Sequence, residues 1–310
     1  MIQTFGEQII SNVSKVMVGK DDVVALALAA ILAGGHVLLE DVPGTGKTML
    51  ARALATSLGL SFRRAQFTPD LLPSDITGVS IYNGSGFEFV AGPIFTHLFL
   101  ADEINRATPK TQSALLEAMA EGQVSADGQT RKLPEPFVVI ATQNPVEMDG
   151  TYRLPEAQLD RFLLRLSVGY PDALEERALL ERLQSEHPIS SLAAVSNAAL
   201  LLEAKAGVRA IRLEPELRSY IVALVQATRI LPEVHLGASP RASLALQSVA
   251  QALAGLAGRD FVLPDDIKRA APGILEHRLI VRSEARLKGV TAASLVRGVL
   301  SRVAVPVETV

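Results

Sequence analysis

A glycine-rich stretch that begins at residue 41 has the residue types of a phosphate-binding loop. Its residues are Asp41, Val42, Pro43, Gly44, Thr45, Gly46, Lys47, Thr48 and Met49. Glycines let successive backbone N–H groups point at phosphate oxygens, and the positive end of a following helix dipole favours the same anion. Lys47 would reach the β- and γ-phosphates, and the Thr48 hydroxyl would ligate Mg²⁺. The general pattern begins with Gly, where this chain has Asp41, and the alternative is a glycine-rich turn with an incidental lysine.

Two adjacent carboxylates follow the apolar run 98–101. Asp102 suits direct or indirect coordination of Mg²⁺, and Glu103 suits polarising a water for attack on a γ-phosphate. An apolar strand followed by two acids is common, and such acids also begin helices. Because this pair lies downstream of a phosphate loop, with strand and helix patterns between, it predicts a hydrolase rather than a binder.

Three further polar side chains stand at the ends of expected elements. Asn144 follows the apolar run 137–141 and could hydrogen-bond a γ-phosphate or the attacking water. Arg161 is expected on a short helix and Arg241 at the start of another, and a guanidinium stabilises charge on phosphoryl oxygens. Taken singly, Asn144 is typical of a turn before Pro145, and each arginine is typical of a solvated or ion-paired surface.

The elements that must position these side chains follow the pattern of an α/β fold with a mainly parallel sheet. Short apolar runs predict buried strands, and helical patterns lie between them. The predicted strands are 37–39, 98–101 and 137–141, and the predicted helices are 48–58 and 111–119. Because ligands of open α/β sheets bind at the carboxyl ends of strands, the phosphate loop, the acidic pair and Asn144 are expected at one site.

Two hairpins and a second domain complete the expected plan. One hairpin joins 79–82 to 87–89 about Asn83–Gly86, and the other spans 124–133 with the turn Asp127-Gly128. Helical spacing dominates the rest of the chain. We therefore expect an α/β domain over 1–170 and a helical domain over 171–310.

Composition excludes several classes of protein. The 310 residues include no Cys, which excludes disulfide frameworks, thiolate metal sites and cysteine nucleophiles. The net charge of −3 divides into −5 for 1–170, with 13 basic and 18 acidic residues, and +2 for 171–310, with 17 and 15. Neither half is strongly basic, so the net charge gives no reason to expect binding to nucleic acid. The start lacks the pattern of a signal peptide, and the early apolar run 23–33 is too short to span a membrane, so we expect a cytoplasmic protein with no transmembrane segment.

Taken together and in this order, these residues resemble the AAA+ ATPases and, within them, the MoxR family. The resemblance covers nearly the whole chain, from Val18-Gly19 to His277-Arg278. The family-like stretches are 38–48, 101–107, 141–145, 156–162 and 237–241. Asp41 is typical of this family, so the departure from the general phosphate-loop pattern does not count against binding.

The resemblance implies a P-loop NTPase core with a mainly parallel sheet flanked by helices, and a smaller all-helical C-terminal lid. It implies binding of ATP or ADP with Mg²⁺. It also implies a role for each candidate residue: Walker A for Lys47 and Thr48, Walker B for Asp102 and Glu103, sensor 1 for Asn144, arginine finger for Arg161, sensor 2 for Arg241, and adenine contacts for Val18 and Gly19. Arg165 is a second finger candidate, because a helix after Asp160 would present it with Arg161 at i, i+4 spacing.

A finger that acts in trans implies a homo-oligomer, and the family implies a hexameric ring. In that ring each site would use Arg161 of the neighbour and Arg241 of the lid. The resemblance further implies chaperone-like remodelling, with a von Willebrand factor A-domain protein as a separate partner or client. Two alternatives stay open. One is a motor on nucleic acid that uses Arg63-Arg64 and Arg131-Lys132, and the other is a nucleotide-gated scaffold with little turnover.

Overall fold

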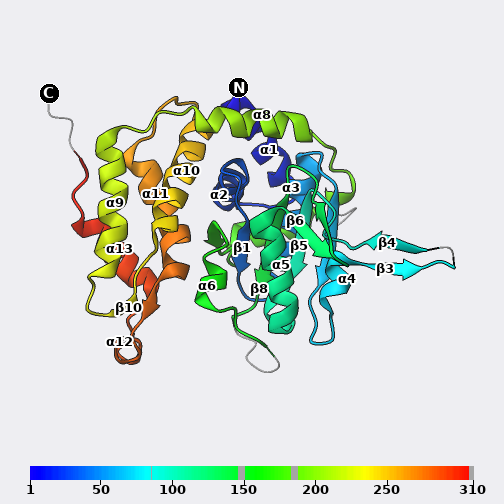
Figure 1. Cartoon of the computed structure of the whole chain (residues 1–310). Helices are drawn as coiled ribbons and strands as arrows, with labels where there is room; N and C mark the ends of the chain where they lie inside the picture. The colour runs from blue at the N-terminus through cyan, green and yellow to red at the C-terminus, as the bar shows by residue number, and fades with distance from the viewer. Residues whose placement is uncertain (85, 146–150, 183–187, 307–310) are drawn as a thin grey trace.

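The computed structural model describes residues 1–84, 86–145, 151–182 and 188–306. At its centre lies a parallel five-stranded sheet in the order β2-β5-β8-β1-β9 (Figure 1). In chain order its strands are β1 (Val37–Glu40), β2 (Phe62–Gln66), β5 (Leu98–Asp102), β8 (Val138–Gln143) and β9 (Leu164–Leu166). This confirms the predicted mainly parallel sheet, with β1 at the position before the phosphate loop.

Helices cover both faces of this sheet because its strands are apolar on both sides. Successive side chains of a strand point to opposite faces. Val37 and Leu39 of β1 therefore join one hydrophobic cluster, and Leu38 joins the other. The first cluster includes α1 (Ile2–Ser14), α2 (Asp21–Leu32) and α3 (Lys47–Ser57), and the second includes α4 (Pro73–Thr77) and α5 (Pro109–Glu121). The helices expected at 48–58 and 111–119 are thus α3 and α5.

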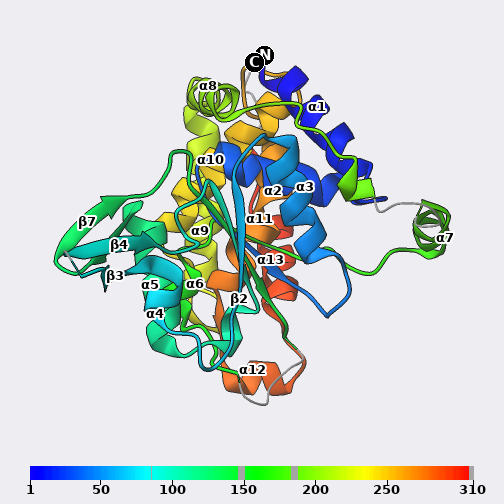
Figure 2. The same ribbon diagram turned by 90° about the vertical axis from the view of Figure 1, so that its right-hand side faces the viewer.

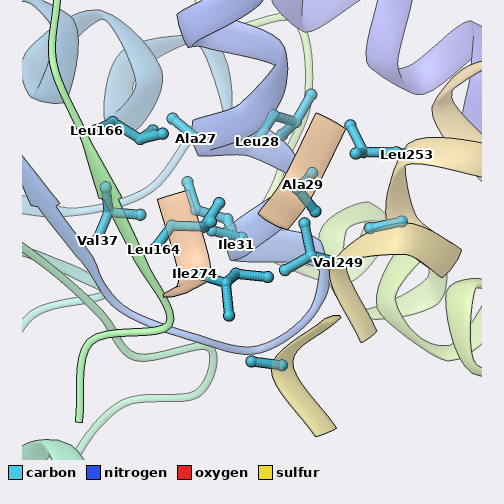
Figure 3. Packing of buried hydrophobic residues seen from close by; sticks show 14 of the residues in the cluster. Ala27, Leu28, Ala29, Ile31, Val37, Leu164, Leu166, Val249, Leu253 and Ile274 are labelled. Atoms are coloured by element: carbon cyan, nitrogen blue, oxygen red, sulfur yellow. The ribbon is translucent and has the colours of Figure 1, made fainter. Parts of the chain in front are cut away.

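Helix α2 joins the sheet to the second half of the chain. It is apolar almost all round, which is typical of a fully buried helix. Figure 3 shows Leu28 and Ile31 of α2 between Val37 of the sheet and Val249 and Ile274 of the C-terminal helices. One continuous hydrophobic cluster therefore spans both halves of the chain.

The second half of the chain is helical, as predicted. Its α-helices are α7 (Ala173–Arg182), α8 (Ala198–Arg209), α9 (Pro215–Arg229), α10 (Pro240–Leu256), α11 (Pro264–Leu275), α12 (Ser283–Leu287) and α13 (Ala292–Arg302). Single 3-10 turns are η2 (Pro188–Ser190) and η3 (Glu276–Arg278). The predicted all-helical lid differs in one respect, since β10 (Val234–Leu236) and β11 (Ile280–Val281) form a short antiparallel pair. The domain boundary at 170/171 stays a prediction.

Both predicted hairpins are present, and they contact each other. The first is formed by β3 (Gly78–Tyr82) and β4 (Phe87–Ala91), and the second by β6 (Gln123–Ala126) and β7 (Gln129–Lys132). Ser85, in the predicted turn of the first, lies outside the described residues. The guanidinium of Arg131 lies 3.8 Å from the centroid of the Phe89 ring. Figure 2 shows both hairpins on the side of the molecule opposite α7.

The edge strands β2 and β9 are absent from the prediction, and this omission makes one expectation wrong. Arg165 lies on β9 and not on a helix with Arg161. Leu164 and Leu166 pair with β1 and point into the hydrophobic core, so Arg165 points the other way. There it forms ion pairs with Glu40 at 2.8 Å and Glu276 at 3.3 Å of its own chain. Among the described residues, no helix is both long and apolar enough to cross a membrane.

Candidate active site

The phosphate loop connects the end of β1 to the start of α3. Gly44 and Gly46 have φ angles of 82° and 87°, in the left-handed region that favours glycine. Gly46 is also the N-cap of α3, and the helix begins at Lys47. The two glycines therefore allow the sharp turn that places the loop at the N-terminus of a helix, where an anion is favoured.

The Lys47 ammonium group lies against the loop itself. Its Nζ donates to the carbonyl oxygens of Asp41 and Val42, each at 2.7 Å. Burial lowers the pKa of Lys47, and the negative charges of Asp41, Asp102 and Glu103 act in the opposite direction. The loop thus holds the positive charge of Lys47 in place, at a cavity that the loop residues line.

The carboxylate of Asp41 anchors the loop to the segment that follows β9. It accepts hydrogen bonds from Gly169 N at 2.6 Å, Val42 N at 2.8 Å and Ser167 Oγ at 2.9 Å. Burial alone would raise the pKa of this carboxyl, but these hydrogen bonds and the charge of Lys47 outweigh it and lower the pKa. The departure from glycine at this position is therefore explained by a contact that positions the loop.

Asp102 lies directly beside Thr48. The Thr48 hydroxyl donates to Asp102 Oδ2 at 3.2 Å, and the Thr142 hydroxyl donates to Oδ1 at 2.5 Å. Mg²⁺ is usually bound by one or two protein oxygens together with phosphates and waters. The Thr48 hydroxyl and the Asp102 carboxylate line one cavity, and they have the chemistry that this ion requires.

Glu103 is held in an uncommon backbone conformation just after β5. Its φ is 56°, which is rare for a residue other than glycine, and its N–H donates to the Thr142 hydroxyl at 2.8 Å. The carboxylate accepts from Gln66 Nε2 at 2.7 Å and from Arg106 at 3.3 Å. Strained backbone of this kind is concentrated at functional sites.

Arg64 and Gln66, both on β2, are site residues that the sequence analysis missed in this role. Arg64 lies 2.8 Å from Asp102 Oδ2, and it also donates to Gln66 Oε1 at 2.6 Å. Strand β2 has no continuous apolar run, because its side chains Arg64 and Gln66 line a polar cavity. The alternation of Arg64 and Gln66 before a loop was the available signal, since alternate residues of a strand share a face.

Two adjoining cavities lie on either side of the phosphate loop. The polar one, of about 390 Å³, is lined by Pro43, Gly44, Thr45, Gly46, Lys47, Thr48, Met49, Arg64, Gln66, Asp102, Glu103, Thr142, Gln143 and Asn144. The other, of about 190 Å³, is largely apolar and is lined by Val16, Met17, Val18, Lys20, Gly44, Thr45, Gly46, Met49, Gly169, Pro171, Leu179 and Pro188. A polar cavity beside an apolar one suits a nucleotide, which has a phosphate end and a base end.

The structure thus brings most of the predicted site residues together. Val18 lines the apolar cavity, whereas Gly19 stands beside it with a φ of 68°, and Glu175 occupies the space that a Cβ would need. Asp41 and Val42 line neither cavity. Arg161 and Arg241 also lie outside both.

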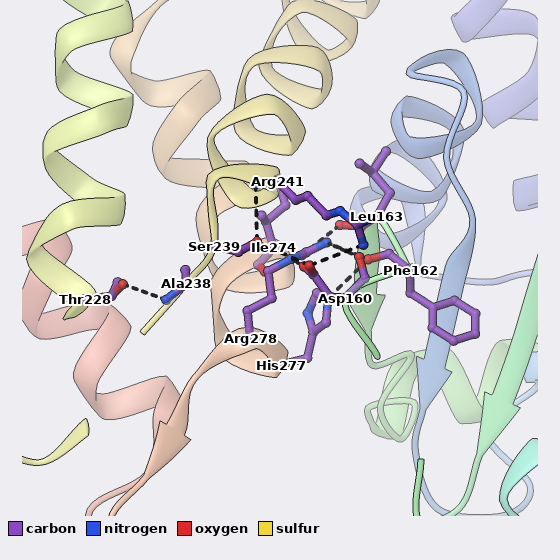
Figure 4. A network of polar contacts seen from close by, with 10 residues as sticks. All are labelled: Asp160, Phe162, Leu163, Thr228, Ala238, Ser239, Arg241, Ile274, His277 and Arg278. Carbon is purple, nitrogen blue, oxygen red and sulfur yellow. Dashed lines mark hydrogen bonds and ion pairs between the residues drawn. The ribbon is translucent and has the colours of Figure 1, made fainter. Parts of the chain in front are cut away.

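Asp160, which precedes Arg161 in the chain, is the centre of a network of hydrogen bonds and ion pairs that includes Arg241 (Figure 4). Asp160 lies 2.6 Å from Arg278 Nε, 3.2 Å from Ser239 Oγ and 3.8 Å from Arg241 NH1. Helix α6 (Glu156–Leu159) ends before this residue, so the exposed Arg161 lies in the following turn and not on the predicted helix. The network therefore joins the segment that carries Arg161 to the start of α10, which carries Arg241.

Arg278 is the most deeply buried ionised member of this network. It donates to the carbonyl oxygens of Ile274 at 2.6 Å and Phe162 at 2.8 Å, and burial lowers its pKa while Asp160 opposes that effect. The neighbouring His277 donates from Nε2 to the Phe162 carbonyl. Burial, followed by the charges of Arg278 and Arg165, lowers its pKa well below the usual range, so His277 is neutral.

We expect Arg278→Ala to lower the free energy of unfolding by about 3–5 kcal/mol, because it leaves the Asp160 carboxylate without its buried partner. The side chains of Arg278 and Asp160 are only 4% and 18% exposed. A matched control is Arg269→Ala, which breaks the exposed pair with Asp22 and should cost about 0–1 kcal/mol. Chemical denaturation measures both variants, and equal losses would contradict the assigned importance of the buried pair.

Comparisons with known proteins agree with this fold. The family model of the ATPase family associated with various cellular activities (AAA) matches residues 36–164, and the AAA lid domain matches residues 226–299. A crystal structure of a suspected ATPase from Cytophaga hutchinsonii superposes with a TM-score of 0.92 at 40% identity, over 99% of this chain and 96% of that one. A full-length MCM homolog from Methanopyrus kandleri, at 19% identity and a TM-score of 0.55, shows a similar fold alone.

Three relatives are similar over almost the whole chain. The uncharacterized protein YeaC of Bacillus subtilis is 54% identical over 96% of this chain and 94% of its own length. The chaperone MoxR1 of Mycobacterium tuberculosis is 42% identical over 97% of this chain and 82% of its own length. The protein MoxR of Methylorubrum extorquens is 32% identical over 95% of this chain and 93% of its own length. The chain belongs to the MoxR family of chaperone-like AAA+ ATPases.

Proposed function

We propose that this protein hydrolyses ATP in the presence of Mg²⁺ and uses the energy to remodel or activate a partner protein. The observation that carries this proposal is the polar cavity, which gathers Lys47, Thr48, Asp102, Glu103 and Asn144 around the N-terminus of α3. A pure nucleotide scaffold needs a phosphate site but has no use for a positioned base. The polar cavity holds a candidate for each, Lys47 and Glu103, which supports hydrolysis over binding alone.

Each side chain has a task in this proposal. The loop N–H groups and Lys47 hold the phosphates, and the apolar cavity holds the adenine. Thr48 and Asp102 hold Mg²⁺, which neutralises charge that develops on the phosphate oxygens. Glu103 polarises the attacking water, and the buried Asn144 orients that water or the γ-phosphate.

We further propose that the active form is a homo-oligomer, as a hexameric ring. Arg161 is exposed and lies outside both cavities of its own chain, which supports a role at the site of a neighbouring subunit. Arg241 lies in the same network as Asp160, and its side chain is 68% exposed. This arrangement favours a contribution of Arg241 to the neighbour's site as well.

The partner is proposed to be a separate protein that carries a von Willebrand factor A domain, and we expect the complex to act in the cytoplasm. The chaperone name of a relative that is 42% identical supports a protein client. The nucleic-acid alternative is not favoured. Of the cations that suggested it, Arg64 is engaged with Asp102, and Arg131 with the Phe89 ring and the Ala126 carbonyl.

Lys47→Ala tests nucleotide binding directly. The change removes the ammonium group that the loop holds in the cavity, and we expect ADP and ATP affinity to fall about a hundredfold or more, as for two charged hydrogen bonds. The control is Lys110→Ala, which removes an exposed lysine at the start of α5. Isothermal titration calorimetry measures both, and unchanged affinity in Lys47→Ala would exclude the assigned phosphate site.

A further inference from the structure

The Arg64 guanidinium lies on the carboxylate that is proposed to hold Mg²⁺. The two oxygens of Asp102 have different partners. Oδ1 accepts from the Thr142 hydroxyl, and Oδ2 faces both the Thr48 hydroxyl and Arg64. Since Thr48 is the other proposed magnesium ligand, Oδ2 is the oxygen on the metal side. Arg64 is therefore placed where the metal would bind.

Arg64 and a divalent cation compete for Asp102 Oδ2. Arg64 is the closer partner in this structure, with Nε and NH2 each at 2.8 Å against 3.2 Å for the Thr48 hydroxyl. The same NH2 group also donates to Gln66 Oε1 at 2.6 Å, so two partners set the position of the guanidinium. Mg²⁺ carries two positive charges and the guanidinium carries one, so they repel each other beside one oxygen, and metal entry favours the departure of Arg64.

The burial of the two partners explains why such a pair exists. The Asp102 side chain is 10% exposed, and a buried carboxylate without a counter-ion is costly. The Arg64 side chain is 48% exposed and extends from β2, a strand at the edge of the sheet. The carboxylate is therefore fixed, whereas the half-exposed guanidinium can move into solvent when its contacts are given up.

We propose that Arg64 is a resident counter-ion, which neutralises Asp102 in the metal-free state and is exchanged for Mg²⁺ when the metal binds. This inference rests on the proposed function, because it takes Thr48 and Asp102 as the magnesium site. It assigns to Arg64 a positioning role: the arginine keeps the carboxylate ordered and sets the cost of metal entry. Arg64 does not act on the phosphates in this proposal.

Metal binding without nucleotide tests the exchange. Mn²⁺ replaces Mg²⁺ as the probe, and the electron paramagnetic resonance signal of free Mn²⁺ reports the bound fraction. We expect Arg64→Gln to bind Mn²⁺ about fivefold to tenfold more tightly than the wild type, since the metal no longer displaces a charge-assisted hydrogen bond. The matched control is Arg63→Gln, which removes the same charge from an adjacent exposed residue that lines neither cavity. That control should change the affinity by less than about twofold, as expected for screened surface charge.

A second substitution assigns the gain to the carboxylate. In Arg64→Gln combined with Asp102→Asn, the tighter binding should disappear. Arg64→Lys keeps the charge but loses the fork of donors, so a smaller gain, about threefold, is expected. Unchanged Mn²⁺ affinity in both Arg64 variants, an equal gain in Arg63→Gln, or a gain that survives Asp102→Asn would each overturn the exchange.

The same experiment separates this inference from the proposed function. It contains no nucleotide, so a chain that failed to hydrolyse ATP could still pass it, and an active ATPase could still fail it. ADP affinity measured with Mg²⁺ distinguishes the remaining rival role. A direct contact between Arg64 and the phosphates predicts weaker ADP binding in Arg64→Gln, whereas the exchange predicts equal or tighter binding. Weaker binding would therefore overturn the proposal.

Discussion

Replacing Glu103 by Gln should leave ATP binding intact and lower the rate of ATP hydrolysis by about 10²–10⁴-fold, the range for loss of a general base. Glutamine keeps the size of the side chain and can still accept a hydrogen bond from Gln66, which lies 2.7 Å from the present carboxylate. It cannot take a proton from water at neutral pH. The substitution therefore removes the chemistry of Glu103 and spares the geometry around it.

Phosphate release and calorimetric ATP binding, measured on the same preparation, test this expectation. The matched control is Glu121→Gln, the same change at an exposed position at the end of α5, which should hydrolyse ATP at the wild-type rate. Turnover of Glu103→Gln within a few-fold of the wild type would assign the base to another group. If Glu103→Gln lost both ATP binding and ATP hydrolysis, the substitution would have disrupted the cavity, and the loss of hydrolysis would not be due to the missing base alone.

The central strands and the phosphate loop could be predicted from sequence because burial on both faces leaves a continuous apolar run. Residues 98–101 and 137–141 show this pattern, and the structure places both in the middle of the sheet as β5 and β8. The same runs predict where the polar residues that follow them lie, since the carboxyl ends of parallel strands meet at one edge of the sheet. Asp102 and Asn144 meet there.

The edge strands could not be predicted in this way, and the errors at the site follow from that. β2 carries Arg64 and Gln66 toward the cavity, so its pattern is polar, and β9 is only three residues long. Without β9, Arg165 had no strand partner and was assigned to a helix. Its ion pairs with Glu40 and Glu276, 125 and 111 residues away in sequence, depend on tertiary contacts that no local pattern encodes.

Arg161→Ala should abolish most ATP hydrolysis, by about 10³-fold or more, if this arginine stabilises the transferred phosphoryl group as an arginine finger does. ATP binding to the chain's own cavity should persist, because Arg161 lines neither part of it. The matched control is Arg218→Ala, an exposed arginine on α9 far along the chain, which should keep full activity. Loss of activity in both variants would indicate a general charge effect.

Mixed subunits decide whether Arg161 acts on its own site or on a neighbour's. In an equal mixture of Arg161→Ala and Glu103→Gln chains, an interface is complete when the first provides Glu103 and the second provides Arg161. Random mixing in a closed ring makes about one quarter of the interfaces complete, so activity should recover to about that fraction of the wild type. Mixing Arg161→Ala with the double variant Arg161→Ala/Glu103→Gln restores no interface and should recover nothing. Where mixed rings demonstrably form, an absence of recovery would place Arg161 at its own site. Arg241→Ala in place of Arg161→Ala should then give the same quarter if Arg241 also acts on a neighbour's site, as we propose from its pairing with Asp160, the residue before Arg161 in the chain.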